Sequence, residues 1–276
     1  MSAQTAAELK RLTPSRVVAL GGQASVCRST VRGAGLDTRP TINCAQTACV
    51  AVTFDDGPSS LTTQVLDIFA TARVPATFFV VGRRVAERST VARNTWIEGH
   101  QIGNHTYDHV RLTELTRAQQ REQMTRTDSL LNDLGMPTTT TMRPPFLAFN
   151  NDTRNIGKAV IMTDVNPKDW DGPSAQQIRT FIRNNVREGS IVILHDTVQN
   201  TVTALPGVLS DFEDAGYTVV TVDELIPDLR PGDLVYNRTT RYRNAVDFDS
   251  DDSVELSDGR VLPPLEDTSD DPTPDH

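Results

Sequence analysis

The chain has 276 residues, a formal net charge of −9 and a pI near 5.0. This length can bury one large core, and α/β barrels of roughly 200–250 residues commonly form a single domain. No apolar run approaches the roughly 20 residues that cross a bilayer, so we predict no transmembrane segment. The acidic balance and the lack of a basic stripe argue against nucleic acid as a partner.

The negative charge lies at the carboxyl end of the chain. Residues 246–276 hold nine Asp and two Glu against one Arg, a net of −10, which leaves +1 for all other residues. A segment rich in Asp, Ser and Pro with few apolar residues is normally disordered. Asp247, Asp249 and Asp251 alternate as at the start of a calcium loop, but Asp252 stands where such a loop needs Gly. We therefore predict an acidic, disordered tail.

The spacing of the three cysteines leaves two alternatives open. Cys44 and Cys49 flank four residues just before an apolar stretch, and Cys27 stands alone. A bridge between Cys44 and Cys49 would close a small loop and indicate an oxidising compartment. Two reduced thiols would instead fit a cytosolic protein, since the apolar stretch at 17–20 is too short for the core of a signal peptide.

Strand-like and helix-like segments alternate along the middle of the chain. The seven predicted strands are residues 50–53, 76–81, 101–104, 139–142, 159–163, 190–194 and 217–220. Helices are predicted at 61–72, in the segment that ends at Gly99, at 116–135 and 174–189 behind capping boxes, and at 203–215. This alternation predicts an α/β fold with a parallel sheet, most economically a closed or nearly closed barrel.

Polar side chains follow the predicted strands at the points where these strands end. Asp55 and Asp56 come directly after the first strand. The later strands are followed by His105 and His109, by Arg143, by Asp169 and Trp170, and by His195. In parallel α/β barrels the carboxyl ends of the strands form one rim, and active sites are built there.

The residue types on this rim point to metal chemistry. Adjacent carboxylates repel each other, so Asp55 and Asp56 are expected to have separate tasks. Two imidazoles and one carboxylate make a three-ligand metal site with an open position, which leaves the second carboxylate as a base. Taken singly, Asp55-Asp56-Gly57-Pro58 is also a good turn, and His195 at a buried strand end could be a core residue. Their joint occurrence on one rim favours a metal-dependent hydrolase.

Five ordered motifs resemble those of the polysaccharide deacetylases, carbohydrate esterase family four. They are T-F-D-D-G-P from Thr53, H-x-x-x-H from His105, R-P-P-F from Arg143, D-W from Asp169 and I-L-H from Ile193. The resemblance covers about residues 44–229 and implies a distorted seven-stranded (β/α) barrel, a catalytic divalent ion and hydrolysis of acetyl groups on sugars. We predict an N-terminal extension at 1–42, one catalytic domain at 43–234 and the acidic tail at 235–276.

The resemblance also implies which residues hold the metal and transfer protons. Asp56, His105 and His109 would be the metal ligands. Oxygen and imidazole ligands suit zinc, and cobalt or nickel can substitute. Asp55 would be the general base that takes a proton from the attacking water, and His195 the general acid that protonates the leaving group.

Five further residues receive supporting roles by the same resemblance. Arg143 would pair with the base and Asp169 with the acid. Phe146 would contact the substrate, with a backbone N–H near it holding the developing oxyanion. Trp170 and Leu194 would shape an apolar slot for the acetyl methyl group.

Three positions depart from the family pattern. Leu147 follows Phe146 where Gly is usual, Asn166 stands where Asp is common, and Ile193 replaces Leu. None of these changes removes a metal ligand or a proton-transfer group. We therefore expect the activity to persist with an altered substrate preference.

The predicted activity is removal of N-acetyl groups from amino sugars of a peptidoglycan-like or chitin-like polymer or oligomer. An O-acetyl esterase on xylan is the alternative, and a non-catalytic carbohydrate-binding protein is a lesser one. Aromatic residues are only 5% of the chain, which offers few stacking platforms and favours short or locally recognised substrates. The resemblance implies an exported, extracellular or cell-wall enzyme, expected to be a monomer, with a disulfide between Cys44 and Cys49 and Cys27 unpaired.

Overall fold

The computed structural model describes residues 42–243, 254–255 and 261–262. Its main sheet has the strand order β6-β1-β2-β3-β4-β5-β8-β9, with β7 also paired to β1. The strands are β1 (Cys49–Asp55), β2 (Thr77–Val80), β3 (Gln101–Asn104), β4 (Thr141–Met142), β5 (Ala159–Ile161), β6 (Ile191–His195), β7 (Thr218–Val220), β8 (Leu234–Val235) and β9 (Arg241–Tyr242). Every pairing from β1 to β8 is parallel, and only β8 and β9 run antiparallel in this sheet.

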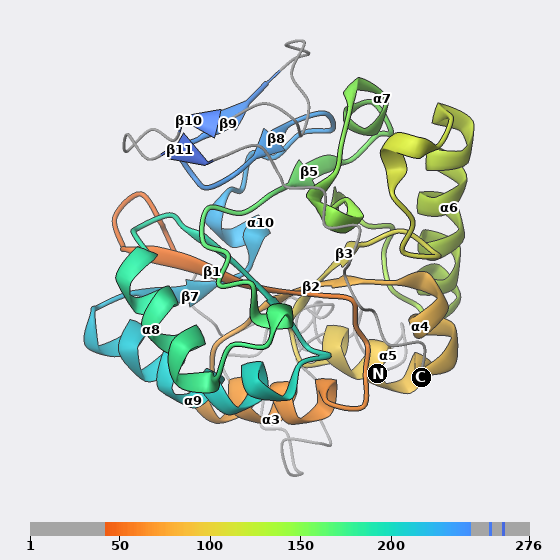
Figure 1. The fold of residues 1–276 in the computed structure, drawn as a ribbon. Helices are drawn as coiled ribbons and strands as arrows, with labels where there is room; N and C mark the ends of the chain where they lie inside the picture. Colours follow the sequence, from red (N-terminus) through yellow and green to blue (C-terminus); the bar gives the residue numbers. More distant parts are fainter. Residues whose placement is uncertain (1–41, 244–253, 256–260, 263–276) are drawn as a thin grey trace, which may run out of the picture.

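The sheet curls until its two ends approach each other. Beyond β5, the N–H groups of Asp164 and Val165 donate to the carbonyl of Ile191 in β6, at 3.3 and 3.4 Å. The N–H of Ile193 donates in return to the carbonyl of Val165 at 3.0 Å. The predicted distorted (β/α) barrel is therefore confirmed, and its seven predicted strands correspond to β1–β7 (Figure 1).

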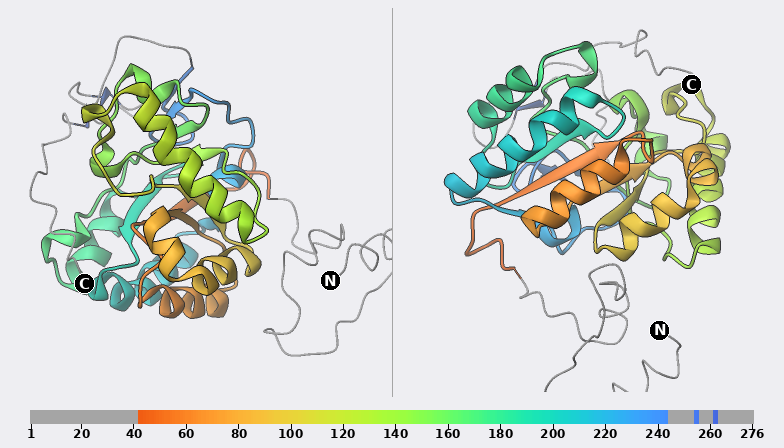
Figure 2. Two further views of the ribbon diagram at one scale, coloured as in Figure 1. Left: turned by 90° about the vertical axis from the view of Figure 1, so that its right-hand side faces the viewer. Right: turned by 90° about the horizontal axis from the view of Figure 1, so that it is seen from below.

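Most of the helices cover the outside of this curled sheet, whereas the short helix α10 (Val222–Leu225) packs on the interior residues around Ala51. The helices are α3 (Thr62–Ala72), α4 (Gly82–Glu87), α5 (Ser89–Ile97), α6 (Arg117–Asp133), α7 (Asn151–Arg154), α8 (Ala175–Asn185), α9 (Gln199–Asp214) and α10 (Val222–Leu225). Three 3-10 turns add η1 (Leu112–Glu114), η2 (Pro145–Leu147) and η3 (Asp169–Asp171). Seen from below, α8, α9 and α3 follow one another across the outer face of the sheet (Figure 2).

Capping residues begin two helices as predicted, whereas a third predicted helix is broken in two. Both predicted capping boxes are present, at Thr116 before α6 and at Ser174 before α8. The helix predicted up to Gly99 is instead two helices, because Arg88 leaves the helical conformation. This break lets α4 pack on α6 while α5 packs on β3 and α3.

Strand alternation divides the apolar core into two parts. On β1, Val50, Val52 and Phe54 face the helices, whereas Ala51 faces the interior of the barrel. We call the layer between the sheet and helices α3, α8 and α9 the outer core; it includes Val50, Val52, Phe54, Val65, Phe69, Phe78, Ile178, Val192, Leu194, Leu205 and Phe212. Phe54 stacks on Phe78, with ring centroids 5.0 Å apart, and meets the edge of Phe69 at 5.6 Å.

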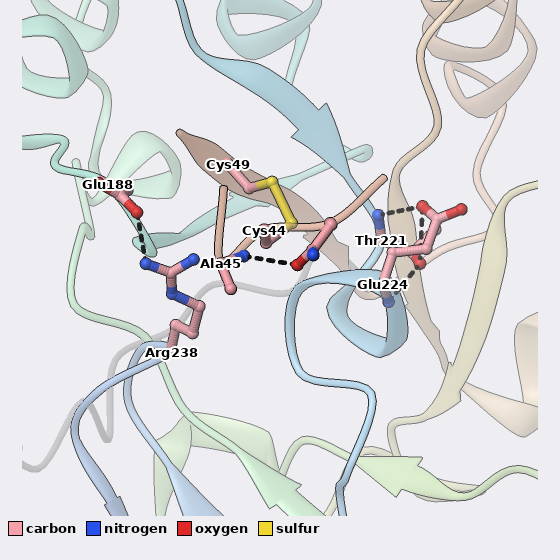
Figure 3. The surroundings of a disulfide bond; sticks show 8 residues. Cys44, Ala45, Cys49, Glu188, Thr221, Glu224 and Arg238 are labelled. Atoms are coloured by element: carbon pink, nitrogen blue, oxygen red, sulfur yellow. Dashed lines mark hydrogen bonds and ion pairs between the residues drawn. A yellow bond between two sulfur atoms is a disulfide. The ribbon is translucent and has the colours of Figure 1, made fainter. Parts of the chain in front are cut away.

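A disulfide fixes the chain where it enters β1. Cys44 and Cys49 are bonded, with their Cα atoms 5.5 Å apart, as predicted from the resemblance (Figure 3). Both side chains are buried inside the barrel. Cys27 lies outside the described residues. In the described part of the chain, no helix has the length and apolar character needed to cross a membrane.

The carboxyl-terminal boundary of the sheet lies beyond the predicted one. Strand β8 spans residue 234, where the domain was predicted to end, and pairs with β5 through Val160 and Leu234. Strand β9 then adds to β8, so the main sheet extends to Tyr242. The structure also describes a short antiparallel pair, β10 (Val254–Glu255) and β11 (Val261–Leu262), within the predicted tail. The rest of that tail, with its alternating aspartates, lies outside the described residues.

Candidate active site

Three predicted metal ligands meet at the carboxyl ends of β1 and β3. Asp56 directly follows β1, and His105 directly follows β3. The Nε2 atoms of His109 and His105 lie 3.0 and 3.3 Å from Oδ1 of Asp56. One ligand atom of each residue lies within 4.8 Å of the other two, and Asp56 and His105 are buried.

The hydrogen bonding of these side chains fits a cation. Nδ1 of His105 lies 2.7 Å from the carbonyl of Arg143, which can only accept, so this nitrogen carries the proton. In the neutral ring Nε2 then has a lone pair that faces Asp56, whose buried Oδ1 receives no hydrogen bond from a described residue. Although burial opposes ionisation, the charge of a protonated His109 and hydrogen bonds from His105 and His109 would hold the pKa of Asp56 well below its usual value, and a bound cation would take over this role. Converging lone pairs around an ionised carboxylate suit a divalent metal ion.

The backbone around this site adopts unusual conformations. Asp56, Thr106, His109 and Phe146 have positive φ values of 72°, 67°, 55° and 60°. Side-chain hydrogen bonds support the histidine loop, because Asn104 accepts from the N–H of Thr106 and the Thr106 hydroxyl accepts from that of His109. Left-handed backbone at non-glycine residues is costly and often accompanies functional sites.

Asp55 is held apart from the metal ligands by a buried arginine. Nη1 of Arg143 donates to Oδ1 of Asp55 at 2.8 Å and to the hydroxyl of Thr53 at 2.6 Å. The rest of the guanidinium donates to the carbonyls of Ile161 and Met162, both at 3.0 Å. Oδ2 of Asp55 points toward the metal site and lies 3.9 Å from Nε2 of His105. The predicted Arg143–Asp55 pair is therefore present, and it orients one carboxylate oxygen toward the site.

A second carboxylate, that of Asp169, orients His195 at the end of β6. Nδ1 of His195 lies 2.7 Å from Oδ1 of Asp169, and the backbone N–H of His195 donates to Oδ2 at 2.8 Å. The hydroxyl of Thr201 donates to the same oxygen. Burial alone would lower the pKa of His195, but Asp169 outweighs it and, with Asp56 and Asp55, raises the pKa to about 10. The Asp169 carboxylate therefore favours the protonated form of His195.

The sheet register brings the two proton-transfer candidates together. Asp55 and His195 are direct Cα partners across the parallel pair β1 and β6. Both are followed by the loops of the rim, and both are almost fully buried. A carboxylate fixed by Arg143 and an imidazole fixed by Asp169 can thus act on one substrate placed at the metal triad.

The predicted substrate-contacting residues divide into two groups. The Phe146 ring packs beside the His109 ring, with centroids 4.9 Å apart, and Trp170 is partly exposed on η3 beside Asp169. Leu194, in contrast, does not fit the predicted slot, because it lies in the outer core on the helix-facing side of β6. Its neighbour Ile193 faces the barrel interior, as His195 does, and replaces Leu194 as the apolar residue of β6 nearest the site.

Leu147, which departs from the family pattern, is almost fully buried. Its φ is 55°, and its side chain is 8% exposed and packs among the interior residues. The unusual residue places a buried leucine in a left-handed conformation that normally favours glycine.

The sequence gives Asp196 no motif role of its own, yet its side chain lies in this region. Its carboxylate is fully buried, accepts from the Thr62 hydroxyl at 2.5 Å, and lies where a Cβ on Gly57 would collide with it. Burial raises the pKa of Asp196 to about 7, against the hydrogen bond from Thr62. The available signal was its position directly after His195. His100 packs locally and accepts from the N–H of Ala76 at 3.0 Å.

The chain resembles proteins of known family over most of its described length. The family model described as polysaccharide deacetylase matches residues 43–165. A solved structure, the T48 deacetylase with substrate, is 35% identical, and the match covers 71% of this chain and 100% of that chain with a TM-score of 0.68. The chain belongs to the polysaccharide deacetylase family.

Other relatives in this family carry different names. The peptidoglycan-N-acetylglucosamine deacetylase PgdA of Listeria monocytogenes is 35% identical over 193 residues, 69% of this chain and 41% of that protein. This chain thus matches less than half of that relative's length. A family 4 acetyl xylan esterase of Clostridium thermocellum, solved with a cobalt ion, is 31% identical with a TM-score of 0.65, covering 68% of this chain and 98% of that one.

Proposed function

We propose that this deacetylase-family chain is a metal-dependent hydrolase that removes N-acetyl groups from amino sugars of a peptidoglycan-like or chitin-like polymer or oligomer. The observation that carries the proposal is that Asp55 and His195 are register partners, next to the metal triad that begins at Asp56. Each has its own buried partner, Arg143 or Asp169, within 2.8 Å. A protein that only binds sugar has no need of a base and an acid so placed.

Asp56, His105 and His109 would hold the metal ion. We propose zinc, with cobalt or nickel as substitutes, because one oxygen and two imidazole nitrogens suit these ions. When bound, a divalent ion of this kind supplies a Lewis acid that activates water and polarises the acetyl carbonyl. The buried Asp56 oxygen without a hydrogen bond from a described residue supports this assignment.

Asp55 would accept the proton of the attacking water. The hydrogen bond from Arg143 occupies Oδ1 of Asp55 and leaves Oδ2 directed toward the site.

The tetrahedral oxyanion would also receive a backbone hydrogen bond at η2. Pro145 has no N–H and the N–H of Leu147 donates to the carbonyl of Pro144, so the N–H of Phe146 is the candidate donor.

His195 would then donate a proton to the leaving nitrogen. Asp169 fixes Nδ1, so Nε2 is the atom available to the substrate. The raised pKa of His195, about 10, keeps the ring protonated at the pH where an amine must be expelled. Ile193 and Trp170 are proposed to contact the acetyl group from β6 and η3.

O-acetyl esterase activity on xylan is the second candidate. It is supported by the likeness to a family 4 acetyl xylan esterase. The same base and acid would serve, but an alkoxide leaves more easily than an amine, so the two activities differ mainly in their need for His195.

We further propose an extracellular or cell-wall location and a monomer. The Cys44–Cys49 disulfide supports an oxidising compartment. Among the described residues, the large apolar side chains that are exposed are Phe181 and Val261, at 40% and 62%, which supports a chain without a large apolar interface. A gel-filtration profile with light scattering would test the monomer.

The deciding experiment is acetate release from peptidoglycan, chitin oligomers and acetylated xylan, each with and without a chelator. The proposal expects chelator-sensitive release from at least one amino-sugar substrate. Release from xylan alone would favour the esterase. Absence of release from all three, with a full complement of metal verified by elemental analysis, would support a non-catalytic protein.

A further inference from the structure

The segment that joins the two histidines of the metal triad has no regular secondary structure, and side chains hold it in place. The four consecutive backbone N–H groups of residues 106–109 all donate to side-chain oxygens. The first and the last of these hydrogen bonds stay within residues 104–109. The middle two, from Tyr107 and Asp108, go to Gln123 of helix α6, a residue that belongs to none of the five motifs.

The side-chain amide of Gln123 is bonded to this segment at both of its ends. Oε1 of Gln123 accepts from the N–H of Tyr107 at 3.0 Å and from that of Asp108 at 2.9 Å. Nε2 donates to Oδ2 of Asp108 at 3.0 Å. A backbone N–H can only donate and an ionised carboxylate can only accept, so the partners require this orientation of the amide. One side chain therefore makes three hydrogen bonds midway between His105 and His109.

The carbonyl groups of the same segment are bonded to another helix. The N–H groups of Gly82 and Arg83, the first two residues of α4, donate to the carbonyls of Thr106 and Tyr107, both at 2.9 Å. Helices α4 and α6 pack against each other (Figure 1). The segment is thus bonded to two packed helices, with α4 supplying donors and Gln123 of α6 supplying the acceptor.

A buried ion pair fixes α6 relative to the strand that leads into His105. Nζ of Lys158 lies 2.6 Å from Oδ2 of Asp128 on α6, and both residues are buried. Oδ1 of Asp128 accepts from Nδ2 of Asn104, the last residue of β3, at 3.1 Å. Gln123 therefore projects from a helix that is tied to the end of β3, where the histidine segment begins.

We propose that Gln123 is a positioning residue for the metal site, whose amide holds the segment from His105 to His109 so that both imidazoles face Asp56. This inference rests on the proposed function, because it takes the triad as the metal site. The backbone conformation supplies the reason. Thr106 and His109 have φ values of 67° and 55°, and left-handed backbone at such residues costs free energy unless its surroundings hold it.

Loss of the Gln123 bonds should therefore weaken metal binding. Without them, the segment would sample other conformations, and Nε2 of His109 would leave its place 3.0 Å from Oδ1 of Asp56. A metal ion would then have to order the segment as it binds, and this ordering would reduce its affinity. Hydrogen-bonding partners that orient metal ligands typically change metal affinity by roughly 10–100-fold.

The test measures zinc affinity in two variants of Gln123. The metal-free protein is titrated with zinc against a chromophoric chelator. Gln123→Met keeps the length of the side chain but removes its hydrogen bonds, and we expect it to raise the dissociation constant by roughly tenfold or more. Gln123→Glu keeps oxygens that accept from both N–H groups, so its affinity should stay much closer to that of the wild type.

A second measurement follows the segment itself, without metal. Hydrogen exchange of the amides of Tyr107 and Asp108 should become faster in metal-free Gln123→Met and stay slow in Gln123→Glu, because these N–H groups lose their acceptor only in the first variant. Leu131→Ala is the control for stability, since Leu131 is fully buried on the same helix but packs in the outer core. It should lower the free energy of unfolding while the folded protein keeps its zinc affinity.

The other outcomes contradict the inference in distinguishable ways. Wild-type zinc affinity in Gln123→Met, even with faster amide exchange, would reject Gln123 as a positioning residue and leave the metal site intact. An equal loss of affinity in Leu131→Ala would assign the effect to general stability and reject the inference as well. If the wild-type protein bound no zinc, the proposed metal function would fall, and this inference with it.

Discussion

The rim and the outer core of this barrel are built on opposite principles. The outer core between the sheet and helices α3, α8 and α9 consists of buried apolar side chains such as Phe54, Phe69 and Leu205. The rim, meaning the last residues of β1 and β6, the residues directly after β1, β3 and β4, and η3, instead buries charges and left-handed backbone. Asp55, Arg143 and Asp169 are each at most 2% exposed there.

The two regions differ in what they contribute to the free energy of folding. Burial of apolar surface stabilises the fold wherever it occurs, whereas a buried ion pair contributes little net stability after desolvation. The positive φ values at Asp56, Thr106 and His109 add a further cost at the rim. We infer that the outer core provides most of the stability of the fold. The buried charges and strained backbone of the rim lower that stability, and in return they position the chemical groups of the site.

The largest expected effect is the loss of activity on metal removal. Chelation should abolish acetate release, and zinc or cobalt should restore it, because the triad offers one oxygen and two nitrogen ligands. Elemental analysis should find one ion per chain. Full activity in a verified metal-free sample would contradict the assignment of the triad as a catalytic metal site.

Asp55→Asn should lower turnover by at least roughly 100-fold, since it removes the general base. Metal content should be unchanged, because Asp56, His105 and His109 remain. Asp67→Asn, at an exposed position of α3, is the control and should have no effect. If the Asp55 variant also lost its metal, Asp55 would have to be counted among the ligands.

His195→Ala should slow the hydrolysis of acetamides by roughly 100-fold or more, because an amine must be protonated to leave. Activated aryl acetates, whose leaving groups need no proton, should suffer much less. Steady-state rates on both substrate types give the answer. An equal loss on both would make His195 a structural or binding residue.

Asp169→Asn should change the pH dependence of activity. His195 works as an acid only while protonated, and its pKa is raised to about 10 chiefly by Asp169 acting against burial. Activity should therefore persist into alkaline pH and fall as the pH rises through the pKa of His195. Without the Asp169 charge that pKa drops, so the basic limb of the kcat/KM profile should move to lower pH. If the basic limb did not move, its pKa would belong to a group other than His195.

Phe69→Ala tests the other side of the comparison. Phe69 is fully buried in the outer core, so the truncation should reduce the free energy of unfolding by about 3–5 kcal/mol. The kcat of the folded fraction should stay near the wild-type value, because Phe69 lies in the outer core on the helix-facing side of the sheet. Denaturant unfolding followed by acetate assays in native buffer measures both. A large loss of kcat with little loss of stability would contradict the assignment of stability to the outer core and of activity to the rim.

Local sequence determined the elements and the residue types of the site. The capping residues Thr116 and Ser174 begin α6 and α8 as predicted, because a cap needs only its own first turn. The placement of Asp56 and His105 after β1 and β3 could also be predicted, since parallel strands end at one edge.

Tertiary structure decided which partners these residues meet and where the sheet ends. Arg143 reaches the hydroxyl of Thr53, 90 positions away, and Thr201 bonds to Asp169, and neither contact has a local signal. The face of Leu194 depends on the pleat of β6 against its neighbours, which a motif alone does not specify. Strand β8 is only two residues long and is stabilised by pairing with β5, so no pattern along the chain marks it. Contacts between distant segments form only when the whole barrel closes, and for that reason the sequence by itself left them open.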